Sequence, residues 1–261
     1  MRIRICFEKT GPVRFVGHLD FMRMFQKCIR KSGLDAVYTA GFNPHMLLSF
    51  AAPLGVGEET TGDCVDVEFA YRDPGVLTEQ EAYRMKDIGL DNEHLPDPPA
   101  AAELTARLDK AMPQGVSVTG AARVGLTKDS KAMALVRFAS WDLMLAEEAL
   151  PGQSAESLAE RTRAFLERPE IRVMKHTKKA ERETDIRPLI RSLTAVKGPE
   201  GERILHLTCA AGSTQNLKPA AVLEAFGSWC GEETPHRLSR LVRTELMDGE
   251  MRPLLSLGTP F

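Results

Sequence analysis

The order in which hydrophobic patterns follow one another constrains the fold more than any other feature of this sequence. Residues 1–7 alternate between apolar and polar side chains, which predicts a half-buried strand with Arg2 and Arg4 on its polar face. Apolar side chains at helical spacing predict a helix over 19–32 that Gly33 ends. The first half continues with predicted extended segments at 36–39, 46–51 and 65–69, a turn at Gly62–Asp63, a helix at 101–111 and a strand at 116–124.

The second half repeats this order. Its predicted elements are strands at 134–145, 171–177, 204–209 and 238–246, a helix from an N-cap at Ser154 to about residue 168, and a helix at 217–229. Each half therefore reads β-α-β-β-α-β. The sequence predicts an α+β protein of two ferredoxin-like (βαββαβ) halves, with antiparallel sheets and helices packed on one face.

We place the first half at residues 1–126 and the second at 127–261. Residues 71–100 are acidic and hold four prolines, which predicts a surface insertion with a short helix near 79–86. The alternative architecture is one continuous α+β domain with a larger sheet.

Charge is distributed unevenly along the chain although the formal net charge is only −2. Residues 1–50 hold eight Lys and Arg against three Asp and Glu, whereas residues 51–100 hold three against twelve. The total argues against a protein that coats nucleic acid indiscriminately. The distribution fits a confined basic surface for RNA or another anionic ligand, and it fits ordinary solvated faces equally well.

Cysteine use and hydropathy indicate the compartment. The five cysteines are far apart and form no CxxC pair, so we expect reduced, mostly buried thiols in a cytoplasmic protein. No run approaches the ~18 apolar residues of a membrane span, and the charged start of the sequence is not the pattern of a signal peptide.

The first candidate site is Gly17-His18-Leu19-Asp20, where a strand passes into the first helix. His18 or Asp20 could simply cap the free N–H groups of the helix, or this end could hold an anion with help from Arg23. Arg23, Lys27 and Arg30 fall on one predicted exposed face of the helix, and we count the first two among the binding candidates.

The second candidate site is the turn Gly41-Phe42-Asn43-Pro44-His45. Asn43 could bond its own backbone in an Asx turn, and the neighbouring proline favours a solvent-presented His45. Gly41, Phe42, Asn43 and His45 are predicted to take part in binding. His18 and His45 are candidate acid and base catalysts, but HxH and HExxH spacings are absent and we predict no metal site.

A third polar cluster combines the run Lys175-His176-Thr177-Lys178-Lys179 with Asp185-Ile186-Arg187-Pro188. Such runs are usually solvated loops, and phosphate binding is the alternative. Asp185 and Arg187 complete the set of binding candidates. Phosphate-binding and hydrolase motifs such as GxxxxGK and GxSxG are missing from the sequence, and we expect no cofactor.

These motifs resemble those of the radical SAM-linked proteins, a bacterial family found beside, or fused to the C-terminus of, a radical SAM enzyme of the B12-binding type. The resemblance rests on His18-Leu19-Asp20 with Arg23, on 41–45, and on the segments Ser49-Phe50-Ala51 and Pro53-Leu54-Gly55-Val56-Gly57. Asp185–Pro188 and an arginine-rich last strand with Arg240 and Arg243 also match, while Gly17 stands where the family usually has serine.

The resemblance implies a radical SAM protein, encoded nearby, as a partner. The chain lacks the cluster-binding CxxxCxxC motif, so the radical chemistry would belong to that partner. Members are often encoded near ribonuclease and ribosomal-protein genes, which implies RNA or the ribosome as a further partner. The double ferredoxin-like order is also similar to that of CRISPR repeat-processing endoribonucleases.

Three functions remain open at this point. The first is a non-catalytic accessory module that binds RNA or a ribonucleoprotein substrate and presents it to the radical SAM partner. The second is a metal-independent endoribonuclease that uses His18 and His45. The third is a module that binds a small anionic metabolite. The first is the function that we favour.

Overall fold

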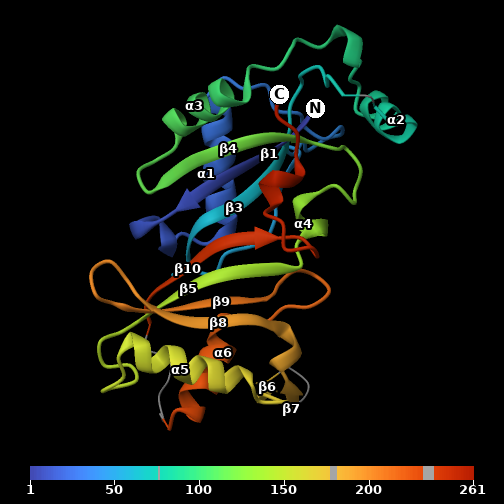
Figure 1. The fold of residues 1–261 in the computed structure, drawn as a ribbon. Helices are drawn as coiled ribbons and strands as arrows, with labels where there is room; N and C mark the ends of the chain where they lie inside the picture. The colour runs from blue at the N-terminus through green and yellow to red at the C-terminus, as the bar shows by residue number, and fades with distance from the viewer. Residues whose placement is uncertain (76, 177–180, 232–237) are drawn as a thin grey trace. The chain divides into compact units, whose positions relative to one another are not determined.

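The computed structural model of the chain describes residues 1–75, 77–176, 181–231 and 238–261. The chain divides into two compact units, of which unit 1 comprises Met1–Val136 and Glu245–Phe261 and unit 2 comprises Arg137–Thr244 (Figure 1). The boundaries expected for the two halves, 1–126 and 127–261, stay a prediction.

Unit 1 has the ferredoxin-like strand order β4-β1-β3-β2, in which every neighbouring pair is antiparallel. Its elements are β1 (Arg2–Lys9), η1 (Gly11–Phe15), α1 (His18–Lys31), β2 (Leu48–Phe50), β3 (Glu59–Glu68), α2 (Glu79–Asp87), η2 (Asn92–His94), α3 (Ala101–Ala111), β4 (Val116–Val124), α4 (Ala132–Leu135) and η4 (Leu254–Leu257). The predicted insertion, residues 71–100, lies in the connection between β3 and α3 and carries the helix α2.

Helices α1 and α3 share a core with one face of this sheet. Phe21 and Phe25 are one helical turn apart on α1, and their rings lie 5.5 Å from the ring of Phe7 on β1. Leu104 of α3 belongs to the same buried cluster. Gly33 ends the α1 segment with φ +70°, a conformation that glycine adopts without a steric penalty.

Unit 2 repeats the topology with the order β10-β5-β9-β8. Its elements are β5 (Phe138–Leu145), α5 (Ala155–Leu166), β6 (Arg172–His176), β7 (Glu181–Asp185), η3 (Arg187–Leu189), β8 (Ile190–Lys197), β9 (Arg203–Ala210), α6 (Pro219–Trp229) and β10 (Leu238–Met247). Strands β6 and β7 form a separate hairpin, and β10 belongs to unit 2 as far as Thr244.

The helices of unit 2 lie on a common face of the sheet, since the ring of Phe165 on α5 contacts the rings of Phe226 and Trp229 on α6. The predicted N-cap is also present: the Ser154 side chain accepts a hydrogen bond from the Ser157 N–H. The α+β class and the two ferredoxin-like halves predicted from the sequence are confirmed.

Several local predictions were wrong. The turn expected at Gly62–Asp63 lies inside β3, where the pairing shifts from Phe7↔Asp63 to Lys9↔Thr60. The extra residue on β3 makes this shift a β-bulge, so the glycine bends a strand instead of ending it. Residues 132–135 form the short helix α4 before β5 begins, and the segment 36–39 makes only isolated bridges.

The face of β1 predicted to be polar and half-buried is fully buried. Its side chains meet β3 in three successive register pairs, Arg2↔Glu68, Arg4↔Asp66 and Cys6↔Cys64. The first two are ion pairs and the third is a disulfide with the Cα atoms 4.2 Å apart. The expectation of five reduced cysteines is therefore wrong for two of them, because a sequence separation of 58 hides that they face each other.

Within the described ranges, no helix combines the length and the apolar character needed to cross a membrane.

Candidate functional site

The first candidate motif lies at the start of α1. Gly17 is the N-cap and offers no side chain, and Asp20 instead accepts a hydrogen bond from Arg23 of the same helix at 2.9 Å. His18 is half-buried because its ring packs edge-on against Phe50, with 5.3 Å between the ring centroids. His18 is thus held against the core, while Asp20 and Arg23 form an exposed ion pair.

The basic side chains of α1 form an exposed row. Arg23, Lys27 and Arg30 are all exposed, as the helical spacing predicted, whereas Phe25 and Ile29 point into the core. Asp20 partly offsets the charge of Arg23. Lys27 and Arg30 leave this face of the helix positive.

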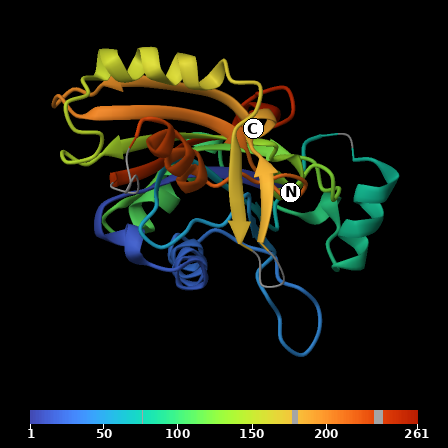
Figure 2. The same ribbon diagram turned by 90° about the horizontal axis from the view of Figure 1, so that it is seen from below.

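The second motif forms an exposed loop between α1 and β2. A backbone bond from Thr39 N–H to His45 C=O (2.8 Å) and one from His45 N–H to Thr39 Oγ1 (2.9 Å) close its base. Gly41 has φ +110°, which a residue with a side chain rarely adopts. In Figure 2 the chain between α1 and β2 projects from the rest of unit 1 as a long blue loop.

The tip of this loop carries the side chains that the sequence singled out. Phe42 is fully exposed, with a relative accessibility of 105%, and Asn43 and His45 are exposed as well. An apolar ring so completely in water makes no contribution to the core. The loop therefore presents an aromatic face, an amide and an imidazole together.

The third cluster belongs to unit 2 and holds the backbone in place. The Asp185 carboxylate accepts hydrogen bonds from the N–H groups of Ile171 and Arg187, both at 2.9 Å, and these bonds lower the pKa of Asp185. Arg187 donates to the carbonyl oxygens of Leu166 (2.8 Å) and Ile190 (3.3 Å). The two side chains thus tie the β6–β7 hairpin to the end of α5.

Thr177, Lys178 and Lys179 of the predicted basic run lie outside the described residues. On the last strand, the guanidinium of Arg243 lies 5.3 Å from the centre of the Trp141 ring in a cation–π contact.

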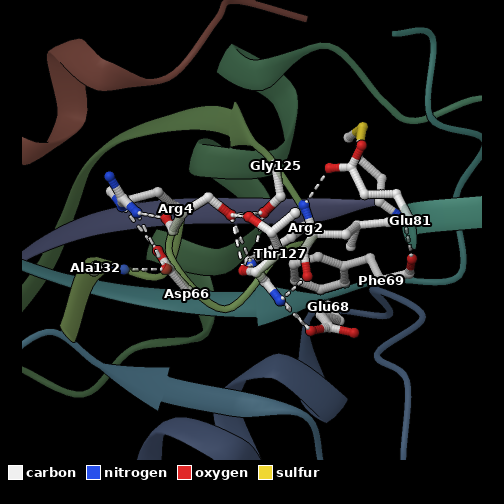
Figure 3. A network of polar contacts seen from close by, with 12 residues as sticks. Arg2, Arg4, Asp66, Glu68, Phe69, Glu81, Gly125, Thr127 and Ala132 are labelled. Carbon is white, nitrogen blue, oxygen red and sulfur yellow. Dashed lines mark hydrogen bonds and ion pairs between the residues drawn. The ribbon is translucent and has the colours of Figure 1, made fainter. Parts of the chain in front are cut away.

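A polar network that the sequence did not reveal lies on the covered face of β1 (Figure 3). Arg2 donates to the carbonyl oxygens of Gly125, Leu126 and Thr127 at 2.6–2.8 Å, in addition to its ion pair with Glu68. Arg4 pairs with both carboxylate oxygens of Asp66 and donates to the carbonyl oxygens of Ser130 and Leu254.

Because these guanidinium groups are buried and bonded to backbone, they hold the 125–132 segment against the sheet and are not placed to receive a ligand. In the sequence, an arginine that alternates with apolar residues predicts only a strand. The carboxylate partners of Arg2 and Arg4 are more than 60 positions away, so the local pattern does not indicate the ion pairs.

The acidic insertion is attached to this network and is not wholly a surface feature. Glu81 of α2 accepts hydrogen bonds from the N–H groups of Leu126 (2.7 Å) and Thr78 (3.0 Å). Burial alone would raise the pKa of Glu81, but these donors outweigh it and the pKa is lowered. Asp73 is likewise buried and is paired with Arg123.

In the described portion of the chain, no group of three or more His, Cys, Asp or Glu side chains is placed to hold a metal ion.

The fold and these motifs can now be compared with known proteins. The chain belongs to a bacterial family described as "uncharacterized protein conserved in bacteria (DUF2344)", which matches residues 2–85 and 75–219. A search of curated proteins found no match.

Among solved structures, the chain is similar to one chain of the "Crystal Structure of a Cbf5-Nop10-Gar1 Complex", at 10% sequence identity and a TM-score of 0.45. That match covers 95% of this chain, which spans about half the length of the other.

Proposed function

We propose that this protein is a non-catalytic recognition module that binds RNA and presents it to a radical SAM partner enzyme. The observation that carries the RNA part is the loop at 41–45, which holds Phe42 fully exposed above a closed base. Exposed aromatic rings are what single-stranded RNA stacks on, at about 1–3 kcal/mol per base.

The neighbours of Phe42 suit the same ligand. The amide of Asn43 can donate to and accept from the edge of an unpaired base, and His45 can donate to a phosphate or a base. Both are exposed on the same short loop. Single-stranded RNA offers unstacked bases together with hydrogen-bonding edges, so it matches all three side chains.

The exposed row on α1 supplies the electrostatic part of the proposal. Phosphate contacts from Lys and Arg release counterions, so each one makes binding more sensitive to salt. Lys27 and Arg30 are exposed and suit this role. The row is confined to one helix, which is consistent with a protein whose net charge is −2.

The resemblance of the His18-Leu19-Asp20 and 41–45 motifs to the radical SAM-linked proteins supports the partner enzyme. The chain has no CxxxCxxC motif of its own, so the reaction on the presented RNA is assigned to the partner. Co-purification of the two proteins, tested with and without RNA, examines this part separately.

The RNA part is tested by fluorescence anisotropy with a labelled single-stranded 12-mer pool. Phe42→Ala is expected to weaken binding about 5- to 150-fold, from the loss of one stacked base. Tyr83→Ala is the matched control, because Tyr83 is also exposed, at 75%, but lies on α2. Equal affinity of wild type and Phe42→Ala would refute the role of the loop.

The same samples distinguish the other functions. Cleavage of the RNA that His45→Ala abolishes would replace the recognition module with an endoribonuclease. A melting temperature raised by a small anionic metabolite, without RNA binding, would favour a metabolite-binding module, because a ligand that binds only the folded state stabilises it.

A further inference from the structure

Strand β8 forms an edge of the sheet in unit 2. It pairs with β9 on one side, and within the described ranges no strand pairs with its other side. An edge strand presents unpaired N–H and C=O groups that can template another strand. Natural edges are commonly protected by charges and bulges along their length.

The charges and the register irregularity of β8 are confined to its two ends. A register irregularity lies at Arg191, and Lys197 is the last residue of the strand. Between them, Ser192-Leu193-Thr194-Ala195-Val196 is uncharged and rich in residues that favour extended backbone. The centre of the edge therefore remains suited to pairing.

A groove of about 380 Å³ lies beside this edge and is lined by residues of β8 and α5. Leu166 and Leu193 give its wall an apolar part, and Thr162 and Thr194 add hydroxyl groups. The volume is sufficient for one or two apolar side chains of an extended chain, which would enter on alternate residues.

The charge of the groove is positive. Arg163 and Arg191 line it together with the single carboxylate of Glu167. Both arginines are exposed, and within the described part of the chain neither guanidinium has an ion-pair partner. Carboxylates are the groups that complement them.

We propose that the β8 edge and this groove bind an extended segment of a partner protein that carries both apolar and acidic side chains on one face. The segment adds a strand to β8, and every second side chain faces the groove: an apolar one beside Leu166 and a carboxylate beside Arg163 and Arg191. A polypeptide fits this surface because only a second backbone matches the spacing of the donors and acceptors along an edge strand.

The probe is a pool of fluorescent hexapeptides in which every second residue is Val, Ile, Leu, Phe, Glu or Asp, with at least one acid in each peptide, and the residues between are Thr. Binding to the full chain is measured by anisotropy. The acidic pool is expected to bind at least tenfold more tightly than the same pool with Lys in place of the acids. N-methylation of alternate peptide nitrogens on the pairing side is expected to weaken binding about tenfold. This test leaves the protein unchanged, so it does not depend on how a variant folds.

Charge reversal supplies the second test. Arg163→Glu and Arg191→Glu are each expected to weaken binding of the acidic pool about five- to tenfold, from the loss and reversal of one charge contact. Arg168→Glu is the matched control, because Arg168 is exposed nearby but does not line the groove. It should bind the pool as the wild type does.

Four outcomes overturn the proposal. In the first, the acidic pool does not bind. In the second, neither N-methylation nor either charge reversal changes its binding. In the third, single-stranded RNA displaces the peptide, and Arg163→Glu and Arg191→Glu weaken the binding of both ligands to the same extent. Dimerisation of the chain lost on Thr194→Pro, without peptide binding, would assign the edge to a second copy and overturn it too.

Discussion

The buried pair of Arg4 and Asp66 gives the sharpest test of how unit 1 is held together. Both side chains are essentially inaccessible, at 0% and 2%, and are joined by two hydrogen bonds of 2.8 and 3.2 Å. Asp66 Oδ2 also accepts the Ala132 N–H at 2.6 Å. Arg4→Met removes the positive charge and leaves the carboxylate buried with that one remaining donor.

The expected cost is about 3–5 kcal/mol in the free energy of unfolding, the usual result of leaving one partner of a buried ion pair uncompensated. At about 2–4 °C per kcal/mol for a unit of this size, the melting temperature should fall by about 6–20 °C. The exposed pair of Asp20 and Arg23 has the same chemistry, with an N–O distance of 2.9 Å. Arg23→Met should cost no more than about 1 kcal/mol, because water already solvates both charges.

The assay is equilibrium urea unfolding of the wild type, Arg4→Met, Asp66→Asn and the double variant. Two unit charges about 3 Å apart attract by about 5–6 kcal/mol at an effective dielectric constant of 20, before the cost of their desolvation. We therefore expect the double variant to be about 2–4 kcal/mol more stable than the sum of the two single losses predicts.

Two results would refute this reasoning. Arg4→Met within 1 kcal/mol of the wild type would mean that Asp66 finds water or another donor. Additive losses would mean that each side chain acts through its backbone contacts alone.

Three further predictions concern stability. Reduction of the Cys6–Cys64 disulfide, or replacement of both cysteines by alanine, should lower the free energy of unfolding. The chain-entropy model gives up to about 4 kcal/mol for a separation of 58 residues. Urea titrations with and without reductant measure this loss. Burial raises the pKa of Glu245, and the negative charge of Asp63 raises it further. The hydrogen bond from the Leu246 N–H lowers the pKa but does not outweigh these two effects. The stability that protonated Glu245 contributes is therefore fully present below pH ~4 and is lost as the pH rises through its folded-state pKa. Glu245→Gln should be more stable than the wild type at pH 7. In thermal melts, the two proteins should reach the same stability near pH 4. Asp185 has the opposite sign: its pKa is lowered, so Asp185→Asn should be less stable than the wild type at pH 7. The difference should disappear as the pH falls through the folded-state pKa of Asp185; an unchanged difference at low pH would contradict this.

The local pattern was enough to predict most helices and strands. The helix predicted over 101–111 is α3 at the same residues, and the strand predicted over 116–124 is β4. Both have apolar side chains at a clear period and a proline or glycine beyond their ends. Where two periods compete in a short stretch, as in 132–138, the sequence could not separate a four-residue helix from the strand that follows.

Contacts between distant segments were beyond such a pattern. The alternation of β1 correctly placed Arg2 and Arg4 on one face, but nothing local shows that the 125–132 segment and Leu254 cover that face. The same limitation hid the disulfide, because only the register of β1 against β3 places Cys64 opposite Cys6. Pairing across a sheet is set by the whole fold, not by the neighbours of each residue.

The candidate site shows where local chemistry is informative. Gly41 and the Asn43–Pro44 pair predicted a turn, and the neighbouring proline predicted that the His45 side chain would be exposed to solvent. His45 is exposed in the structure. Full exposure of Phe42 could not be predicted, since an aromatic residue is buried more often than not. The exposed ring is the observation on which the proposed interface rests, because an aromatic side chain in water is free to stack on an unpaired base. For the same reason Phe42→Ala should leave the stability of unit 1 within about 0.5 kcal/mol of the wild type while weakening RNA binding. A substitution that lowered both would place the ring in the core and remove the main support for the proposed interface.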